Sequence, residues 1–157
     1  MRTLIALVLF SSIGLCQDVP QRLKNAAAKD ARVEQPQGKE NSQFGAVRLV
    51  FNAVEAALVA GNAGSLSPLL AKQVSMTIRG NESGFFSSAQ SLTILKKFFS
   101  PRKPTQFSFS RLNDTVSHPY ATGRLDFVLR GSKESVQVYV SLTQQDSAWV
   151  ISQFNIY

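Results

Sequence analysis

The sequence predicts an α+β domain in which helices pack on one face of an antiparallel sheet. Three observations lead to this fold class. Apolar residues recur at helical spacing from Phe44 to Leu58, and a second helical pattern with its own capping residues covers 87–99. The last part of the chain alternates apolar and polar residues in strand-like segments at 120–129, 136–142 and 148–157. With 157 residues, the chain has room for one such domain with a stable core.

The first expected helix is apolar on most of its surface. Its apolar residues are Phe44, Val47, Phe51, Val54 and Leu58, with Val50 and Ala57 widening the same face. The polar stripe between them is narrow, so we expect this helix to be covered on most sides and to lie at the centre of the fold. Gly61 and Asn62 are expected to end it.

Two short elements should follow this helix. Ser67 immediately before Pro68 resembles a helix N-cap with proline at the first helical position, which predicts a short helix or turn. Residues 74–78 alternate apolar and polar side chains as a half-buried strand does. The stretch "RGNESG" then turns the chain toward Phe85 and Phe86.

The segment 87–99 predicts an amphipathic helix. Ser87 followed three residues later by Gln90 is the pattern of a capping box, and Pro101 stops the helix at its other end. We expect its apolar face to pack into the sheet while the basic residues of its last turn face water. The residues concerned are Leu92, Leu95 and Phe99 on the apolar face, and Lys96 and Lys97 in water.

The remainder of the chain predicts strands. Residues 106–112 place Phe107 and Phe109 on one face, and three longer strands follow. The stretches "RGSK" and "QQDS" between these strands are typical of tight turns. The last three strands should therefore form an antiparallel meander.

The N-terminal residues predict export. Residues 1–16 read as a signal peptide, 17–43 as a polar flexible linker and 44–157 as the α+β domain. The apolar run of the signal is shorter than the roughly 20 residues that a membrane-spanning helix needs, so we expect no transmembrane segment and a periplasmic or secreted protein. Lipid attachment to Cys16 is the less favoured alternative, because Leu15 stands where such signals carry a small residue.

Composition narrows the function classes. The formal net charge of +7 suits either an anionic partner or simple solubility. No dense Lys/Arg stripe interleaved with aromatics occurs outside 84–100, so we expect no nucleic-acid binding. With one histidine and one cysteine in the chain, we expect no metal site, and we expect no cofactor.

Four stretches carry a resemblance to a known family: "VFNAVEAALVAGNAGSLSPLL", "GFFSSAQSLTILKKFF", "YATGRL" and "VQVYVSLTQQDSAWVISQFNIY". Over about residues 47–157 the chain resembles small exported bacterial proteins known only as domain of unknown function 4783, within the nuclear-transport-factor-2-like (SnoaL-like) fold. The resemblance implies a cystatin-like cone, a bent sheet wrapped around helices, with the ligand at its open end and frequent dimerisation through the sheet. Some relatives are isomerases or dehydratases, but none of their catalytic motifs can be matched here.

Candidates for acid–base chemistry are few. His118 precedes Pro119 in an expected loop, where an exposed turn residue is the simpler interpretation. Asp126 alternates with the apolar positions of its strand, so it should point away from the helix-covered face and pair with a base or with solvent. The weak candidates for a catalytic role are Glu55, His118, Tyr120 and Asp126.

Residue size suggests a ligand pocket. On the face of segment 120–129 that carries larger apolar residues, two positions are too small to fill the space around them. The hypothesis is a modest apolar pocket lined by Phe51, Phe107, Phe109, Ala121, Gly123 and Trp149. The alternative is that helix side chains such as Phe51 simply fill this space.

These patterns favour a domain that binds a small apolar ligand or a protein partner without catalysis, with a homodimer through the sheet as one arrangement. The alternative is an isomerase- or dehydratase-like enzyme. Such an enzyme needs at least two titratable groups that converge inside the cavity.

Overall fold

The computed structural model describes residues 37–79, 82–115 and 117–157. The predicted signal peptide and residues 17–36 of the predicted linker lie outside these ranges. The elements in chain order are α1 (Gln37–Val59), the 3-10 helix η1 (Ala63–Leu69), β1 (Leu70–Ile78), β2 (Glu82–Ser87), α2 (Ser88–Phe99), β3 (Arg102–Asn113), β4 (Tyr120–Leu129), β5 (Ser132–Gln145) and β6 (Ala148–Ile156). Within the described ranges, no helix is long and apolar enough to cross a membrane.

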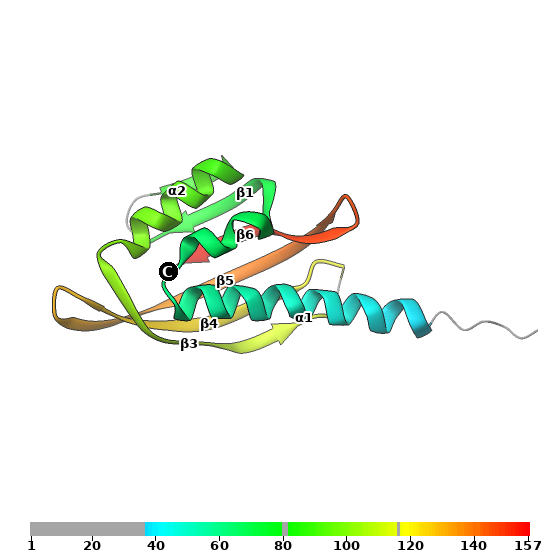
Figure 1. Cartoon of the computed structure of the whole chain (residues 1–157), viewed down its shortest axis with the longest axis horizontal. Coiled ribbons are helices and arrows are strands. Elements are labelled where there is room, and N and C mark those ends of the chain that lie inside the picture. Colours follow the sequence, from blue (N-terminus) through cyan, green and yellow to red (C-terminus); the bar gives the residue numbers. More distant parts are fainter. Residues whose placement is uncertain (1–36, 80–81, 116) are drawn as a thin grey trace, which may run out of the picture. The chain divides into compact units, whose positions relative to one another are not determined.

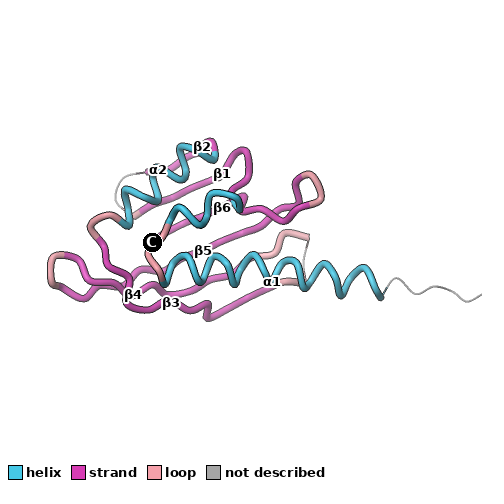
Figure 2. Tube along the Cα trace, in the orientation of Figure 1, coloured by secondary structure: helices cyan, strands magenta, loops and turns pink. Residues whose placement is uncertain are grey.

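The six strands form one sheet in the order β2-β1-β6-β5-β4-β3, with helices packed on one of its faces (Figures 1 and 2). Strands β4 to β6 form the antiparallel meander that the sequence predicts, and β3 extends it by pairing antiparallel with β4. Strand β1 then pairs parallel with β6, and β2 pairs antiparallel with β1. The predicted α+β class is confirmed.

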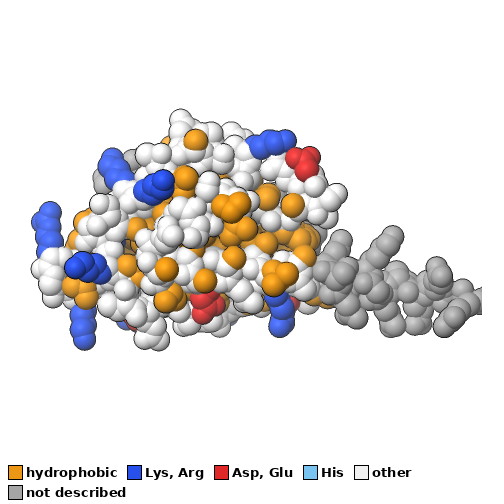
Figure 3. All heavy atoms as spheres, viewed as in Figure 1, with side chains coloured by type: hydrophobic (Ala, Val, Ile, Leu, Met, Phe, Trp, Pro, Cys, Tyr) orange, Lys and Arg blue, Asp and Glu red, His pale blue; other side chains and the backbone are white. Residues whose placement is uncertain are grey.

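Helix α1 packs against β3, β6 and η1 through its buried residues Val47, Phe51, Val54 and Leu58. It begins at Gln37, inside the segment predicted as linker, where Glu, Lys and Gln are all good helix formers. The expectation that most of this helix is covered is wrong for the described part of the chain. Leu49 is 69% exposed on the side away from the sheet, and apolar side chains show across this side of the molecule in Figure 3.

Helix α2 confirms the predicted capping box. The Ser87 backbone amide donates to the Gln90 side-chain oxygen at 2.9 Å, and the Gln90 amide donates to the Ser87 hydroxyl at 3.3 Å. Leu95 and Phe99 are buried and Leu92 is half-buried against the core. The lysines of the last turn, Lys96 and Lys97, are exposed as expected.

One local prediction is wrong and one element was not predicted. The N-cap of η1 is Asn62, whose side-chain oxygen accepts from the Gly64 amide at 3.0 Å, and Pro68 lies inside the helix. The predicted turn agrees with the antiparallel pairing of β1 and β2, in which Ile78 lies opposite Glu82, but the sequence did not predict that Phe85 and Phe86 belong to a strand, β2. This strand has no regular apolar alternation, and it is extended because it pairs with β1 along its length, as between Val74 and Phe86.

Alternation along the strands gives the sheet two different faces. On β4, residues Ala121, Leu125 and Phe127 are buried beneath the helices. Thr122 and Arg124 alternate with them and therefore lie on the opposite side, called here the helix-free face. The core occupies the space between the sheet and the helices, and polar side chains cover the helix-free face.

Candidate functional site

The strand register builds a polar row across the helix-free face. Ser108 of β3 lies opposite Arg124 of β4, which in turn lies opposite Gln137 of β5. Tyr157 continues the row, because its amide donates to the Gln137 carbonyl at 2.9 Å and the Gln137 amide donates to the Tyr157 carbonyl at 3.3 Å. Neighbouring strands lie about 4.8 Å apart, so this row spans about 14 Å from β3 to the end of β6.

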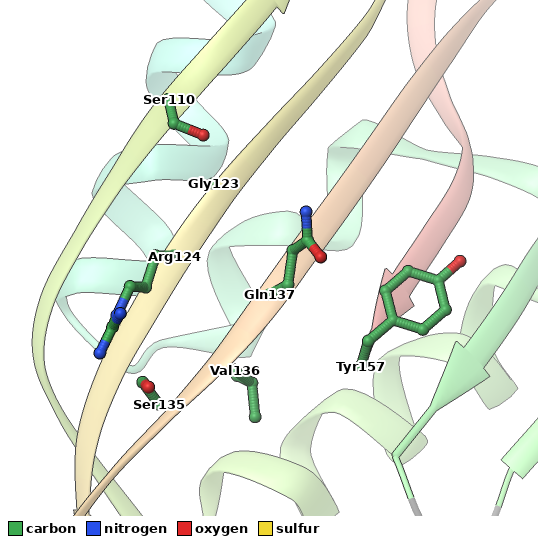
Figure 4. A pocket seen from close by; sticks show the side chains of 7 residues that line it. All are labelled: Ser110, Gly123, Arg124, Ser135, Val136, Gln137 and Tyr157. Carbon is green, nitrogen blue, oxygen red and sulfur yellow. The ribbon is translucent and has the colours of Figure 1, made fainter.

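Two shallow depressions open along this row. The first has a volume of about 280 Å³, and Figure 4 shows it with the helices behind the strands. Its lining residues are Ser110, Gly123, Arg124, Ser135, Val136, Gln137 and Tyr157. Most of these side chains end in a hydroxyl, amide or guanidinium group.

The second depression adjoins the first, since both are lined by Arg124 and Ser135. Its volume is about 450 Å³. The other lining residues are Thr105, Gln106, Asp126, Phe127, Lys133 and Glu134. Together the two adjoining depressions cross β3, β4 and β5; we call this surface the sheet-face groove.

Arg124 lies at the junction of the two depressions. Its Nε donates to Asp126 Oδ1 at 2.9 Å, with the side chains 71% and 37% exposed. At this exposure the ion pair contributes little stability, of the order of 0.2–1 kcal/mol. Its main effect is to orient the guanidinium, and the bond engages Nε rather than the two terminal nitrogens.

The charge around the groove is mainly positive. Register places Lys103 and Lys133 on either side of Val128, on the same face as Asp126, and Arg111 opposite Thr122. These basic residues and Arg124 outnumber the carboxylates of Asp126 and Glu134 among the described side chains at or beside the groove. The surface therefore attracts anionic groups over a distance of about one Debye length, roughly 10 Å.

The four candidate catalytic residues are not brought together. Glu55 lies on α1, on the opposite side of the sheet from Tyr120 and Asp126. Tyr120 stacks on Tyr139 with ring centroids 5.9 Å apart, and it lies about 20 Å along β4 from Asp126.

His118 is exposed in the loop before β4, where its Nδ1 lies 3.2 Å from the Ser117 hydroxyl. Asp126 does point away from the helices and pairs with a base, as predicted. Among the described residues, no group of three or more His, Cys, Asp or Glu side chains could hold a metal ion.

The predicted apolar pocket is filled at its centre. A Cβ atom built on Gly123 would lie 2.8 Å from Cζ of Phe107, so this ring already occupies the space above the glycine. Phe109 contacts Phe107 and Phe51 edge-on, with ring centroids 4.9 and 5.6 Å apart.

The other two predicted lining residues belong to the same packed interior. Ala121 is fully buried, and Trp149 packs against the core. Binding of an apolar ligand at these residues stays a prediction, and it would require the phenylalanine rings to move.

A sequence model of the family described as "Domain of unknown function (DUF4783)" matches residues 51–157. The chain belongs to the DUF4783 family. The match includes every residue of the sheet-face groove, from Thr105 to Tyr157. A comparison with curated proteins finds no match.

Solved structures agree with this membership. The DUF4783 protein is similar to a DUF4783 family protein from Bacteroides uniformis, with 21% identity and a TM-score of 0.61, over 67% of this chain and 93% of that one. It is also similar to a nuclear-transport-factor-2-like protein of unknown function from Shewanella oneidensis, with 14% identity and a TM-score of 0.52, over 71% of this chain and 96% of that one. The nuclear-transport-factor-2-like fold is thereby confirmed.

An enzyme shares this fold as well. A Mycobacterium tuberculosis epoxide hydrolase, described as LEH-like, matches 74% of the DUF4783 chain and 84% of its own, with 12% identity and a TM-score of 0.55. At this identity the similarity concerns the fold alone.

Sequence reasoning missed most of the groove. Arg124 and Gln137 could have been assigned to the helix-free face, because they alternate with the apolar residues of their strands. Ser110 and Tyr157 could not have been placed beside them. Their positions depend on a register irregularity in β3 and on the pairing of the last residue with β5.

Proposed function

We propose that this DUF4783 protein is an exported binding domain without catalytic activity, whose ligand or partner lies in the sheet-face groove. The observation that carries the proposal is the contrast between the two faces of the sheet. Aromatic rings fill the space between the sheet and the helices at Gly123, whereas the helix-free face holds two adjoining depressions. A ligand can enter these depressions without displacing core side chains.

The absence of catalysis is supported by where the titratable candidates lie. Acid–base catalysis requires groups within hydrogen-bond reach of the same reacting atoms. Glu55, Tyr120 and Asp126 lie on different sides of the sheet or far apart on one strand. In the groove itself, Asp126 is held by Arg124, and an arginine is unsuited to proton transfer at neutral pH.

Export rests on the N-terminal sequence, in which Arg2 precedes an apolar run and a small residue follows at Cys16. Mass spectrometry of the protein recovered from cell fractions tests this part. The expected species begins at Gln17 and is found outside the cytoplasm. A cytoplasmic species that keeps residues 1–16 would contradict export.

The binding proposal is tested by native mass spectrometry of the protein purified from its own cells. A bound species is expected with the unaltered protein and is expected to be lost from the double variant Arg124→Ala, Gln137→Ala. Lys97→Ala on α2 is the matched control, because it also removes an exposed side chain but lies away from the groove. A bound species that survives the double variant would place the ligand elsewhere and overturn the proposal.

The same measurement reports stoichiometry. A homodimer through the sheet would cover the groove with a second copy, as the family resemblance implies for many relatives. A dimer that dissociates in the Arg124→Ala, Gln137→Ala variant would identify the partner as this chain itself, and the ligand of the proposal would then be a second protomer.

A further inference from the structure

We propose that the ligand of the sheet-face groove is an acidic oligosaccharide, with one of its carboxylates bound by Arg124. This inference rests on the function proposed above and adds the chemical class of the ligand. It is drawn from the donors that line the groove, the charge around it, its length and the scarcity of apolar anchors.

The first step concerns Arg124. Asp126 engages only its Nε, so the edge formed by the two terminal nitrogens can donate two parallel hydrogen bonds. Two parallel donors match the geometry of a carboxylate, and charge-assisted bonds of this kind are about twice as strong as neutral ones. An arginine held by an acidic neighbour loses less side-chain freedom on binding than an unrestrained one.

The second step concerns the groups around this arginine. Ser110 and Ser135 contribute hydroxyls and Gln137 contributes an amide, all lining the same depression (Figure 4). Ser135 and Gln137 can both donate and accept hydrogen bonds, whereas the Ser110 hydroxyl already donates to the Thr122 carbonyl at 3.2 Å and is left as an acceptor. A row of such groups matches the hydroxyl groups of a sugar chain, each of which also donates and accepts.

The third step concerns Tyr157 at the end of the row. Its hydroxyl accepts from Asn155 Nδ2 at 2.9 Å, and Asn155 is itself buried and accepts from the Thr77 amide at 3.0 Å. The ring is thus held in place although the residue is 53% exposed. A fixed, exposed aromatic ring offers an apolar surface on which the C–H face of a sugar ring can pack.

The fourth step concerns size and charge. The groove crosses several strands and spans about 14 Å, which suits more than one sugar ring. Lys103, Arg111 and Lys133 surround it and favour a ligand that carries repeated negative charge. A neutral saccharide carries no charge that these basic side chains could attract.

The composition of the groove also favours a saccharide over a peptide or a second copy. Protein partners are typically held by a few fully buried aromatic or aliphatic anchors. Apart from the exposed ring of Tyr157, the large apolar residues that line the two depressions are Phe127 and Val136, and both are buried. The groove therefore lacks an apolar pocket into which a protein anchor could insert.

Isothermal titration calorimetry tests the proposal, with the protein purified from its own cells. The probes are short oligomers of galacturonate, mannuronate and hyaluronate, each beside a version whose carboxylates are methyl-esterified. We expect at least one acid form to bind and its ester to bind at least tenfold more weakly. Arg124→Ala should weaken binding by roughly tenfold to a hundredfold, as loss of a charged hydrogen bond does.

Two further variants sharpen the test. Arg124→Lys keeps the charge but loses the paired donors, so its affinity should lie between those of the unaltered protein and Arg124→Ala. Lys97→Ala should bind like the unaltered protein, and thermal unfolding shows whether each variant remains folded. Equal binding of acid and ester forms, or binding unchanged in Arg124→Ala, would overturn the role of the carboxylate.

The remaining outcomes separate this inference from the function on which it rests. If none of the oligosaccharides binds while native mass spectrometry still shows a species that depends on Arg124 and Gln137, the ligand class is wrong and the binding proposal stands. Binding of poly-glutamate as tightly as the best oligosaccharide would replace the saccharide by an acidic peptide. A bound species independent of both residues overturns the two proposals together.

Discussion

Replacement of Gly123 by alanine is the sharpest test of how the interior is packed. The added Cβ would lie 2.5 Å from the backbone oxygen of Ser108 and 2.8 Å from Cζ of Phe107. An ordinary contact begins at 3.4 Å, so strand β3 or the ring must retreat by several tenths of an ångström. Because one of the two obstacles is backbone, the strain cannot be relieved by a change of rotamer alone.

The magnitude follows from two opposing terms. Overpacking of a close-packed interior costs about 1–3 kcal/mol, and the backbone contact places Gly123→Ala in the upper part of that range. Alanine also restricts the unfolded chain, which stabilises the folded state by about 0.4–1 kcal/mol. We therefore expect the free energy of unfolding to fall by about 1.5–2.5 kcal/mol.

Urea denaturation, followed through the fluorescence of the chain's one tryptophan, measures this change. Gly45→Ala is the matched control, because no heavy atom lies within 4 Å of its Cβ and the residue is in helix α1. That variant should gain about 0.5–1 kcal/mol. If Gly123→Ala were as stable as the unaltered protein, the space above the glycine would be empty. The apolar pocket would then be favoured over the sheet-face groove as the ligand-binding site.

Other substitutions test the remaining contacts. Ser87→Ala removes one half of the capping box and should lower the free energy of unfolding by about 1 kcal/mol in urea; no change would mean that α2 does not depend on its cap. Asp114→Asn breaks the 2.6 Å ion pair with the exposed Arg48 and should cost at most about 1 kcal/mol, an effect that shrinks in 1 M salt; an effect independent of salt would indicate a different cause. Phe51→Ala should cost about 3–5 kcal/mol, whereas Leu49→Ala on the exposed side of α1 should stay within about 0.5 kcal/mol; similar losses at both positions would show that a partner or another part of the chain covers Leu49.

Local patterns predict those parts of this fold that depend on nearby residues. The cap of α2 is made by Ser87 and Gln90, three residues apart, so its two hydrogen bonds follow from the sequence. Strands β4 and β5 are joined by a tight turn in which Arg130 and Gly131 both have positive φ, a geometry typical of hairpin turns. The alternation along these strands then fixes which side chains face the helices.

The candidate site depends on contacts between distant parts of the chain. The apolar alternation of β4 identifies Ala121 and Gly123 as small, but it does not say whether Phe107 fills the space that they leave. That answer depends on the register between β3 and β4, which is shifted at two places. The expectation of an apolar pocket therefore used residue sizes that were correct. It could not include the packing of Phe107 over Gly123, because no local pattern contains that packing.

The α+β class, the capped helix α2, the antiparallel meander and the side of the sheet to which each alternating residue belongs follow from the sequence, because hydrophobic periodicity and turn chemistry are local properties. Three features become visible only in the folded chain: β1 pairs parallel with β6, β2 is a strand, and one depression is lined by Ser110, Arg124, Gln137 and Tyr157. The physical reason is that strand order and register are set by which distant surfaces bury the most apolar area together, and a single strand carries no record of its neighbours.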